Sequence, residues 1–131
     1  MAAQTRPPKT VLVIEDHRPN RLVLKGHLEG AGYRVLEATS GRSGLALARA
    51  GGVDLITLDM LMEPIDGQTV FRELRADPST RDIPVVVITI DETMPADLKA
   101  DGFLAKPFSG QRLLELIERT LDAPERPASP R

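Results

Sequence analysis

Residues 53–59, Val-Asp-Leu-Ile-Thr-Leu-Asp, form a short apolar run that ends in a carboxylate, and this stretch decides the fold. A similar run at residues 11–14 ends in Glu15 and Asp16, and another at residues 85–88 ends in Thr89. Runs this short and this rich in Val, Ile and Leu are typical of parallel strands buried on both faces. The sequence therefore predicts a parallel sheet with polar residues at the carboxyl ends of its strands, where open sheets of this kind bind ligands.

Helix-like segments separate the predicted strands in a regular alternation. We expect strands at residues 10–14, 33–38, 53–58, 84–89 and 103–105, and helices at residues 19–30, 41–50, 67–76 and 109–121. In the first helix Leu22, Val23 and Leu28 lie near helical spacing. The segment from Ile90 to Asp101 is too short for a full helix with two connections. We expect one or two helical turns near residues 95–100 there, or an irregular loop.

The alternation predicts the fold class as α/β, a flavodoxin-like (βα)5 doubly wound parallel sheet. The expected strand order is 2-1-3-4-5, with the fourth helix short or irregular. In that order the switch point lies between strands one and three, so Glu15, Asp16 and Asp59 are expected to meet there. Lys106 follows the last strand and is expected at the same edge.

Composition narrows the class of protein. The chain has 131 residues, a net charge of −2, no cysteine and 3% aromatic residues. These values argue against nucleic-acid binding, a disulfide framework and a thiolate metal site, and no apolar stretch suits a membrane helix. We expect a flexible arm at residues 1–9, a folded domain at 10–122 and a disordered tail at 123–131. A cytoplasmic protein that is a monomer or a weak dimer is the default expectation.

Three carboxylates, a hydroxyl and an ammonium at one edge suit a divalent cation and a phosphoryl group. Mg²⁺ prefers oxygen ligands, which Glu15, Asp16 and Asp59 would supply directly or through water. An oxygen of Asp59 could then attack a phosphoryl group and form an acyl phosphate. The Thr89 hydroxyl and the Lys106 ammonium could each take one of the phosphoryl oxygens.

These residues give the chain a resemblance to a known family. It resembles the receiver domain of bacterial two-component response regulators over about residues 10–122. The matching segments, in chain order, are Val13-Ile14-Glu15-Asp16 with Asn20, Leu58-Asp59-Met60-Leu61-Met62 with Asp66-Gly67, Val85 to Thr89, and Phe103-Leu104-Ala105-Lys106-Pro107-Phe108. Each motif is weak alone, whereas all of them in order at strand ends make a specific signal.

The resemblance implies a phosphorelay role, in which a histidine kinase or a histidine phosphotransfer protein phosphorylates Asp59. It implies Mg²⁺ held by Glu15, Asp16, Asp59 and the backbone carbonyl of Leu61. It also implies a conformational switch made by Thr89 and Phe103. The expected protein is a stand-alone regulator, not an enzyme, that binds an output protein or passes the phosphoryl group onward.

Three features depart from the family pattern. Glu63 stands where the loop after Asp59 usually has a proline, and it adds negative charge near the site. Ile90 stands where the residue after Thr89 is usually small, and its bulk would narrow access to the phosphoryl group. The segment between Thr89 and Lys106 is shorter than the common form, so the surface that usually binds the output protein is in doubt. Similar shortening occurs in some receivers that are attached to hybrid histidine kinases.

Two other functions remain open from the sequence. A pseudo-receiver would have the same fold and bind a partner constitutively, which Glu63, Ile90 and the short segment favour. The intact set of site residues opposes it. A magnesium phosphohydrolase would need a general acid, often an aspartate two residues after the nucleophile, and Leu61 stands there instead.

Overall fold

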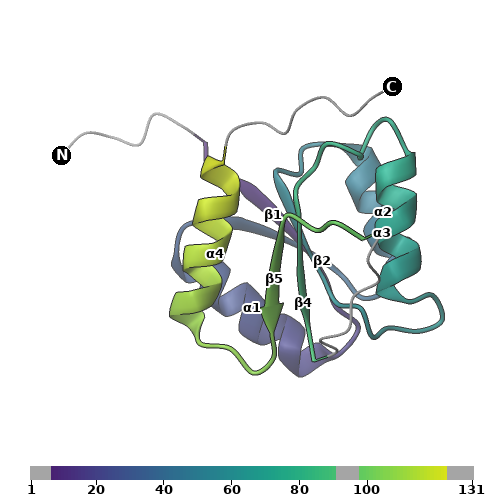
Figure 1. Ribbon diagram of the computed structural model, residues 1–131. Helices are drawn as coiled ribbons and strands as arrows, with labels where there is room; N and C mark the ends of the chain where they lie inside the picture. The colour runs from purple at the N-terminus through teal and green to yellow at the C-terminus, as the bar shows by residue number, and fades with distance from the viewer. Residues whose placement is uncertain (1–6, 91–97, 124–131) are drawn as a thin grey trace.

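One parallel sheet organises the chain. The computed structural model describes residues 7–90 and 98–123. Its strands are β1 (Thr10–Ile14), β2 (Arg34–Ala38), β3 (Leu55–Leu58), β4 (Val85–Thr89) and β5 (Gly102–Ala105), and its helices are α1 (Arg18–Gly30), α2 (Gly41–Ala50), α3 (Gly67–Ala76) and α4 (Gly110–Asp122). The strands pair in the order β2-β1-β3-β4-β5, all parallel (Figure 1). The predicted flavodoxin-like fold class and strand order are confirmed.

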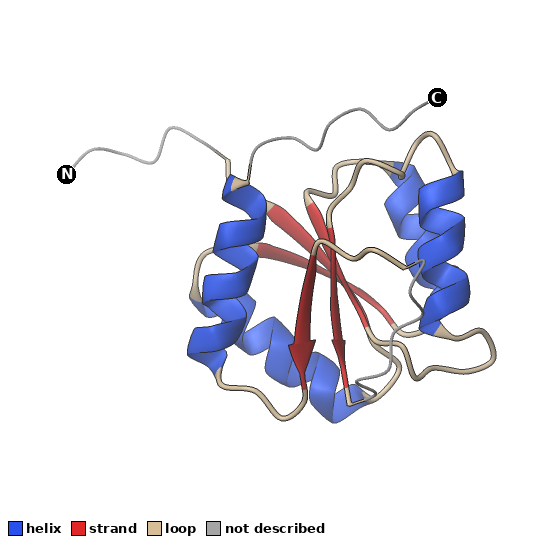
Figure 2. Cartoon of the chain, in the orientation of Figure 1, coloured by secondary structure: helices blue, strands red, loops and turns tan. Residues whose placement is uncertain are grey.

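Helices cover both faces of the sheet. In Figures 1 and 2, α1 and α4 lie on one face and α2 and α3 on the other. Side chains that alternate along each strand therefore enter two separate cores. Leu12, Ile56, Leu58, Val70 and Leu74 belong to the core under α2 and α3, and Val11, Val13, Leu24, Leu28 and Ile117 to the core under α1 and α4. Burial on both faces explains why the strands are continuous apolar runs.

Most element boundaries agree with the prediction within a residue. The exception is β3, which begins at Leu55 and not at Val53. Asp54 forms a junction there, because its amide donates to the Thr10 carbonyl at 2.9 Å and its Oδ2 accepts from the Thr10 amide at 2.8 Å. The helical turns expected near residues 95–100 fall partly outside the described residues, and residues 98–100 are not helical.

Polar side chains fix the beginnings of the helices. Ser40 and Ser43 form a reciprocal capping box at α2, and the Ser109 hydroxyl accepts from the Arg112 amide at α4. At α3 the cap is Asp66, whose Oδ1 accepts from the amide and the hydroxyl of Thr69, both at 2.9 Å. These bonds satisfy amides that the first turn of a helix leaves unpaired.

The Asp66 cap predicts a pH-dependent contribution to stability. The Thr69 amide is the main cause that lowers the pKa of Asp66 below its ordinary value of 3.8. The ionised cap therefore contributes fully above pH 3.8, and its contribution is lost as the pH falls through the lower folded-state pKa. We expect Asp66→Ala to lower the free energy of unfolding by about 1 kcal/mol at neutral pH and by less in acid. Urea unfolding measures this, and an Asp66→Ala loss independent of pH would contradict it.

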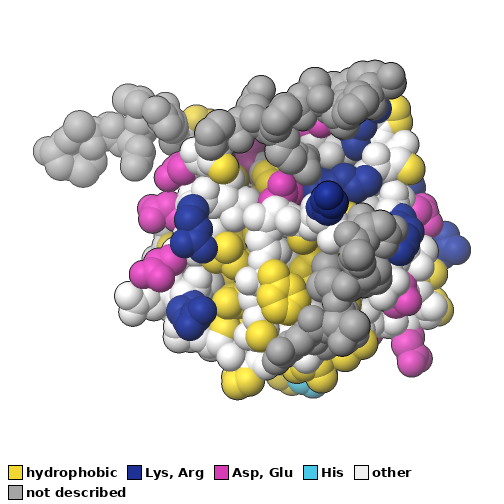
Figure 3. Space-filling view, in the orientation of Figure 1, with side chains coloured by type: hydrophobic (Ala, Val, Ile, Leu, Met, Phe, Trp, Pro, Cys, Tyr) yellow, Lys and Arg dark blue, Asp and Glu magenta, His cyan; other side chains and the backbone are white. Residues whose placement is uncertain are grey.

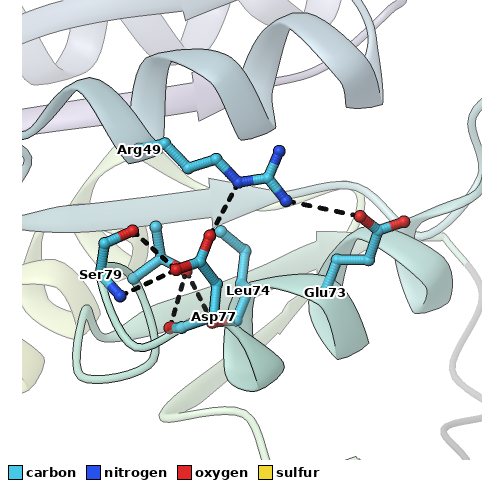
Figure 4. Close-up of polar contacts among 6 residues, drawn as sticks. Arg49, Glu73, Leu74, Asp77 and Ser79 are labelled. Atoms are coloured by element: carbon cyan, nitrogen blue, oxygen red, sulfur yellow. Dashed lines mark hydrogen bonds and ion pairs between the residues drawn. The ribbon is translucent and has the colours of Figure 1, made fainter.

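Ion pairs join α2 to α3 at the molecular surface. Arg49 Nε lies 2.9 Å from Asp77 Oδ2, and Arg49 Nη2 lies 3.5 Å from Glu73 Oε1 (Figure 4). Asp77 also accepts from the amide of Ser79 at 2.9 Å and from its hydroxyl at 2.8 Å, so the turn after α3 is fixed as well. Exposed pairs of this kind orient the helices more than they stabilise them.

A second arginine joins elements at the end of the sheet where the strands begin. Arg75 Nη1 donates to the carbonyls of Arg81 at 3.2 Å and Ile83 at 2.9 Å, and Nη2 lies 2.8 Å from Asp101 Oδ2. Asp101 Oδ2 also accepts from the Val85 amide at 2.8 Å. Arg75 therefore ties the end of α3 to the beginnings of β4 and β5.

Tyr33, just before β2, lies at this same end of the sheet and packs against the core under α1 and α4.

Thr57 and Thr80 form a natural contrast within the described residues. Both are 1% exposed, but Thr80 Oγ1 donates to the Leu74 carbonyl at 2.7 Å, whereas Thr57 Oγ1 has no hydrogen-bond partner. Thr57 lies in β3 beside Val13 and Val86. We expect Thr57→Val to raise the free energy of unfolding by about 1 kcal/mol and Thr80→Val to lower it by about the same amount. Urea unfolding of both variants tests this, and a destabilised Thr57→Val would contradict it.

Within the described part of the chain, none of the helices has the length and apolar character needed to cross a lipid bilayer.

Candidate functional site

Three carboxylates meet at the carboxyl ends of β1 and β3. Glu15 and Asp16 follow β1, and Asp59 follows β3. One oxygen from each of the three side chains lies within 4.8 Å of the other two. Glu15 is 1% exposed and Asp59 is 6% exposed, while Asp16 lies on the surface. The strand order predicted that these three residues lie close together, and the structure confirms their proximity.

Lys106 lies between the two buried carboxylates. Its Nζ is 2.8 Å from Glu15 Oε1 and 3.2 Å from Asp59 Oδ2. The Lys106 amide donates to the Thr89 carbonyl at 3.1 Å, so the end of β4 positions the lysine. Burial raises the pKa of Glu15, and the nearby Asp59 adds to this, while the Lys106 ammonium acts in the opposite direction. The lysine thus offsets negative charge that the fold concentrates at this edge.

The loop after β3 approaches Asp59 closely. The Leu61 amide donates to Asp59 Oδ1 at 3.1 Å, which orients the carboxylate. The amide of Gly67 donates to the Met60 carbonyl at 3.0 Å. A Cβ atom on Gly67 would lie only 2.3 Å from the Asp59 carbonyl oxygen and 2.5 Å from Met60 Cα. Only glycine allows α3 to begin this near to Asp59.

Arg21 of α1 is part of the same environment, and our reading of the sequence missed it. Its side chain is buried, and Nη1 donates to the backbone carbonyl of Glu15 at 3.1 Å. Its Nε lies 3.1 Å from Glu37 Oε1 on β2. Local spacing gave no signal, because the partners of Arg21 come from two different strands. A buried arginine needs such partners, and only the fold shows them.

The remaining predicted site residues lie at the same edge or beside it. Thr89 is fully buried as the last residue of β4. The side chain of Leu61 lies on the surface. Phe103 of β5 is 40% exposed, and Figure 3 shows hydrophobic side chains gathered over β5, with charged ones over α4 beside them. The switch roles of Thr89 and Phe103 and the ligand role of the Leu61 carbonyl stay predictions.

Two of the departures from the family pattern lie on the surface. Glu63 is exposed in the loop between β3 and α3. Ile90 is 64% exposed and directly follows Thr89. An apolar side chain this exposed beside a polar site is available to contact whatever approaches that site.

Comparison with protein families identifies the fold's relatives. The model of the response regulator receiver domain matches residues 11–118. The polar-differentiation response regulator DivK of Brucella anthropi is 30% identical over 119 residues, which cover 87% of this chain and 97% of DivK. The DNA-binding dual master transcriptional regulator RpaA of Synechocystis is 36% identical over 121 residues. The match covers 88% of this chain but only 50% of RpaA, and the match to PleD of Caulobacter vibrioides covers 25% of that relative.

Solved structures show the same architecture. The receiver domain of the sensor histidine kinase PA1611 from Pseudomonas aeruginosa PAO1 has a TM-score of 0.81 and 26% identity, over 88% of this chain and 99% of that one. That structure has a magnesium ion coordinated in its active-site cleft. The signal receiver domain of a histidine kinase from Syntrophus aciditrophicus has a TM-score of 0.81 and 30% identity, over 94% and 97% of the two chains.

Proposed function

Because this chain belongs to the response regulator receiver domain family, we propose that it accepts a phosphoryl group on Asp59. The donor is a histidine kinase or a histidine phosphotransfer protein. The observation that carries the proposal is the meeting of Asp59, Glu15, Asp16 and Lys106 at the edge of the sheet where Thr89 also ends its strand. None of these residues belongs to either hydrophobic core.

The transfer uses a carboxylate oxygen of Asp59 as the nucleophile. This oxygen forms a bond to phosphorus while the bond from phosphorus to the donor nitrogen breaks, and the imidazole leaves with that electron pair. Lys106 Nζ, 3.2 Å from Asp59 Oδ2, pairs with one phosphoryl oxygen, and the Thr89 hydroxyl donates to another. The Leu61 amide, which holds Asp59 Oδ1, orients the attacking group.

The acidic cluster has the donor chemistry that Mg²⁺ requires. Glu15, Asp16 and Asp59 are oxygen ligands on one small patch, and the Leu61 carbonyl would add a fourth. When bound, the ion neutralises charge that develops on the phosphoryl oxygens. The same side chains also explain why Lys106 lies between two of them, since the cluster needs a cation.

The phosphorylated state then changes a binding surface. We propose that Thr89 turns toward the phosphoryl oxygen and that Phe103, 40% exposed on β5, turns inward behind it. An output protein recognises the change, or the phosphoryl group passes onward to a second histidine. The chain itself performs no turnover of a small substrate.

The decisive experiment is intact mass spectrometry after incubation with acetyl phosphate. We expect wild-type protein to gain one phosphate only when Mg²⁺ is present, and Asp59→Asn to gain none. Asp59→Asn keeps the size of the side chain and replaces the nucleophilic carboxylate with a neutral amide, so it is a matched control. The absence of any gain in wild-type protein would contradict the proposal and favour a pseudo-receiver that binds its partner constitutively.

Ile90 is expected to control the lifetime of the phosphorylated form. Its side chain is 64% exposed next to Thr89, where it would limit the approach of water to the acyl phosphate. We therefore expect Ile90→Ala to lose its phosphoryl group faster than the wild type, with little change in stability because the residue is on the surface. The decay of the phosphorylated mass after removal of the donor measures this. An equal decay rate in the two proteins would exclude a shielding role.

A further inference from the structure

We propose that Arg21 is a positioning residue that fixes the backbone between Glu15 and Asp16 and thereby sets the affinity of the acidic cluster for Mg²⁺. This inference rests on the proposed function and adds a residue from outside the cluster to it. Arg21 lies in the first turn of α1, immediately after the loop that carries Asp16. It contacts neither Asp16 nor Asp59 through any described hydrogen bond, so it acts through the chain and not on a ligand directly.

The backbone of Glu15 is held at both ends. Its amide donates to the Ala38 carbonyl at 3.1 Å, which extends the ladder between β1 and β2. Its carbonyl accepts from Arg21 Nη1 at 3.1 Å, in a bond that is fully buried. Beyond this carbonyl the chain leaves the sheet, and the next residue is Asp16. The Arg21 bond therefore fixes the peptide plane on the N-terminal side of Asp16, while on its other side the His17 amide donates to Glu15 Oε2 at 3.3 Å.

Arg21 is itself held firmly. The residue is 8% exposed, and Nε lies 3.1 Å from Glu37 Oε1 on β2. Glu37 Oε2 also lies 3.1 Å from Lys25 Nζ. The bond from Lys25 is the main cause that lowers the pKa of Glu37, and Arg21 adds to it, so Glu37 is ionised at neutral pH. A planar guanidinium donates from several nitrogens in a rigid fork, so Arg21 holds a carboxylate through Nε and a carbonyl through Nη1, whereas a lysine would donate from one nitrogen on a flexible chain.

Positioning and charge predict opposite effects on Mg²⁺ binding. If Arg21 acted only as a positive charge near the cluster, its removal would relieve repulsion and strengthen Mg²⁺ binding. If Arg21 positions the loop, its removal loosens Asp16 and weakens binding. Residues that orient metal ligands commonly change affinity by about tenfold or more when they are removed. The sign of the change therefore separates the two roles.

The chain also offers a matched control at the opposite end of the sheet. Arg75 likewise binds backbone carbonyls and one carboxylate, Asp101, from a helix. Arg75→Met removes a comparable network far from the carboxyl ends of the strands. It should lower stability without altering the acidic cluster. A loss of affinity caused merely by a less stable protein would appear in both Arg21→Met and Arg75→Met.

The test is isothermal titration of the full chain with MgCl₂. We expect Arg21→Met and Arg21→Lys to weaken Mg²⁺ binding by about tenfold, and Arg75→Met to bind like the wild type. Arg21→Lys keeps the charge and protects the measurement if Arg21→Met does not fold. Unchanged or stronger Mg²⁺ binding in the Arg21 variants would overturn the inference, as would equally weakened binding in Arg75→Met. In either case, Mg²⁺ binding by the wild type would leave the proposed function intact. No Mg²⁺ binding by the wild type would overturn both.

Discussion

Replacing Lys106 with methionine is expected to lower the free energy of unfolding by about 3 kcal/mol at neutral pH without Mg²⁺. Lys106 is the cation between Glu15 and Asp59, whose side chains are 1% and 7% exposed. Its removal leaves two buried carboxylates facing each other without a positive charge. Saturating Mg²⁺ should restore most of the loss, because the ion neutralises the same oxygens. Thermal unfolding with and without Mg²⁺ measures both effects.

Lys25 provides the control for this variant. Lys25 Nζ also pairs with a glutamate, at 3.1 Å from Glu37 Oε2, but the lysine lies at the surface. Lys25→Met should therefore lose much less stability and gain no more from Mg²⁺ than the wild type does. A Lys106→Met protein that is as stable as the wild type without Mg²⁺ would show that Glu15 and Asp59 do not depend on the lysine for their burial.

Replacing Gly67 with alanine is expected to lower the free energy of unfolding by about 3 kcal/mol. The added Cβ would lie 2.3 Å from the Asp59 carbonyl oxygen, and backbone atoms cannot move aside as a flexible side chain can. The loop after β3 must shift, and Asp59 must shift with it. We therefore also expect much slower labelling of Gly67→Ala by acetyl phosphate. Urea unfolding and intact mass give the two readouts.

Gly26 distinguishes this clash from a general effect of alanine in a helix. A Cβ atom on Gly26 of α1 would meet nothing within 4 Å. Gly26→Ala should therefore raise the free energy of unfolding by about 0.5–1 kcal/mol, since alanine favours a helix interior. If Gly67→Ala were stabilised as well, the close approach of α3 to Asp59 would not constrain the site.

The fold was predictable from sequence because its strands are buried on both faces. Such strands form uninterrupted apolar runs, and the helices between them begin and end at clear signals, such as Ser40 before α2 and Gly30 at the end of α1. Boundaries set by a contact between distant residues were not predictable. The prediction began β3 at Val53, because nothing local reveals that Asp54 binds Thr10 across the sheet. The structure places the strand's beginning at Leu55.

The site was predictable where topology alone brings residues together. Strand order was sufficient to place Glu15, Asp16, Asp59 and Lys106 at one edge. Strand order and apolar spacing did not predict which residues of α1 are buried. Leu22 and Val23 fit the apolar spacing but are 42% and 51% exposed. Arg21 is buried in their place because its charge finds partners at Glu15, directly after β1, and at Glu37 on β2. A pattern of apolar residues cannot identify a buried cation whose partners lie elsewhere in the sequence.

The position of Tyr33 makes intrinsic fluorescence a test of whether a structural change at the site is transmitted through the sheet. Tyr33 is the single tyrosine of a chain without tryptophan, so it dominates the intrinsic fluorescence. It lies just before β2, a strand-length of about 15 Å from the edge that carries Asp59. A change confined to that edge leaves its emission constant. Any shift in tyrosine emission on phosphorylation would therefore report a rearrangement transmitted along the whole length of the strands.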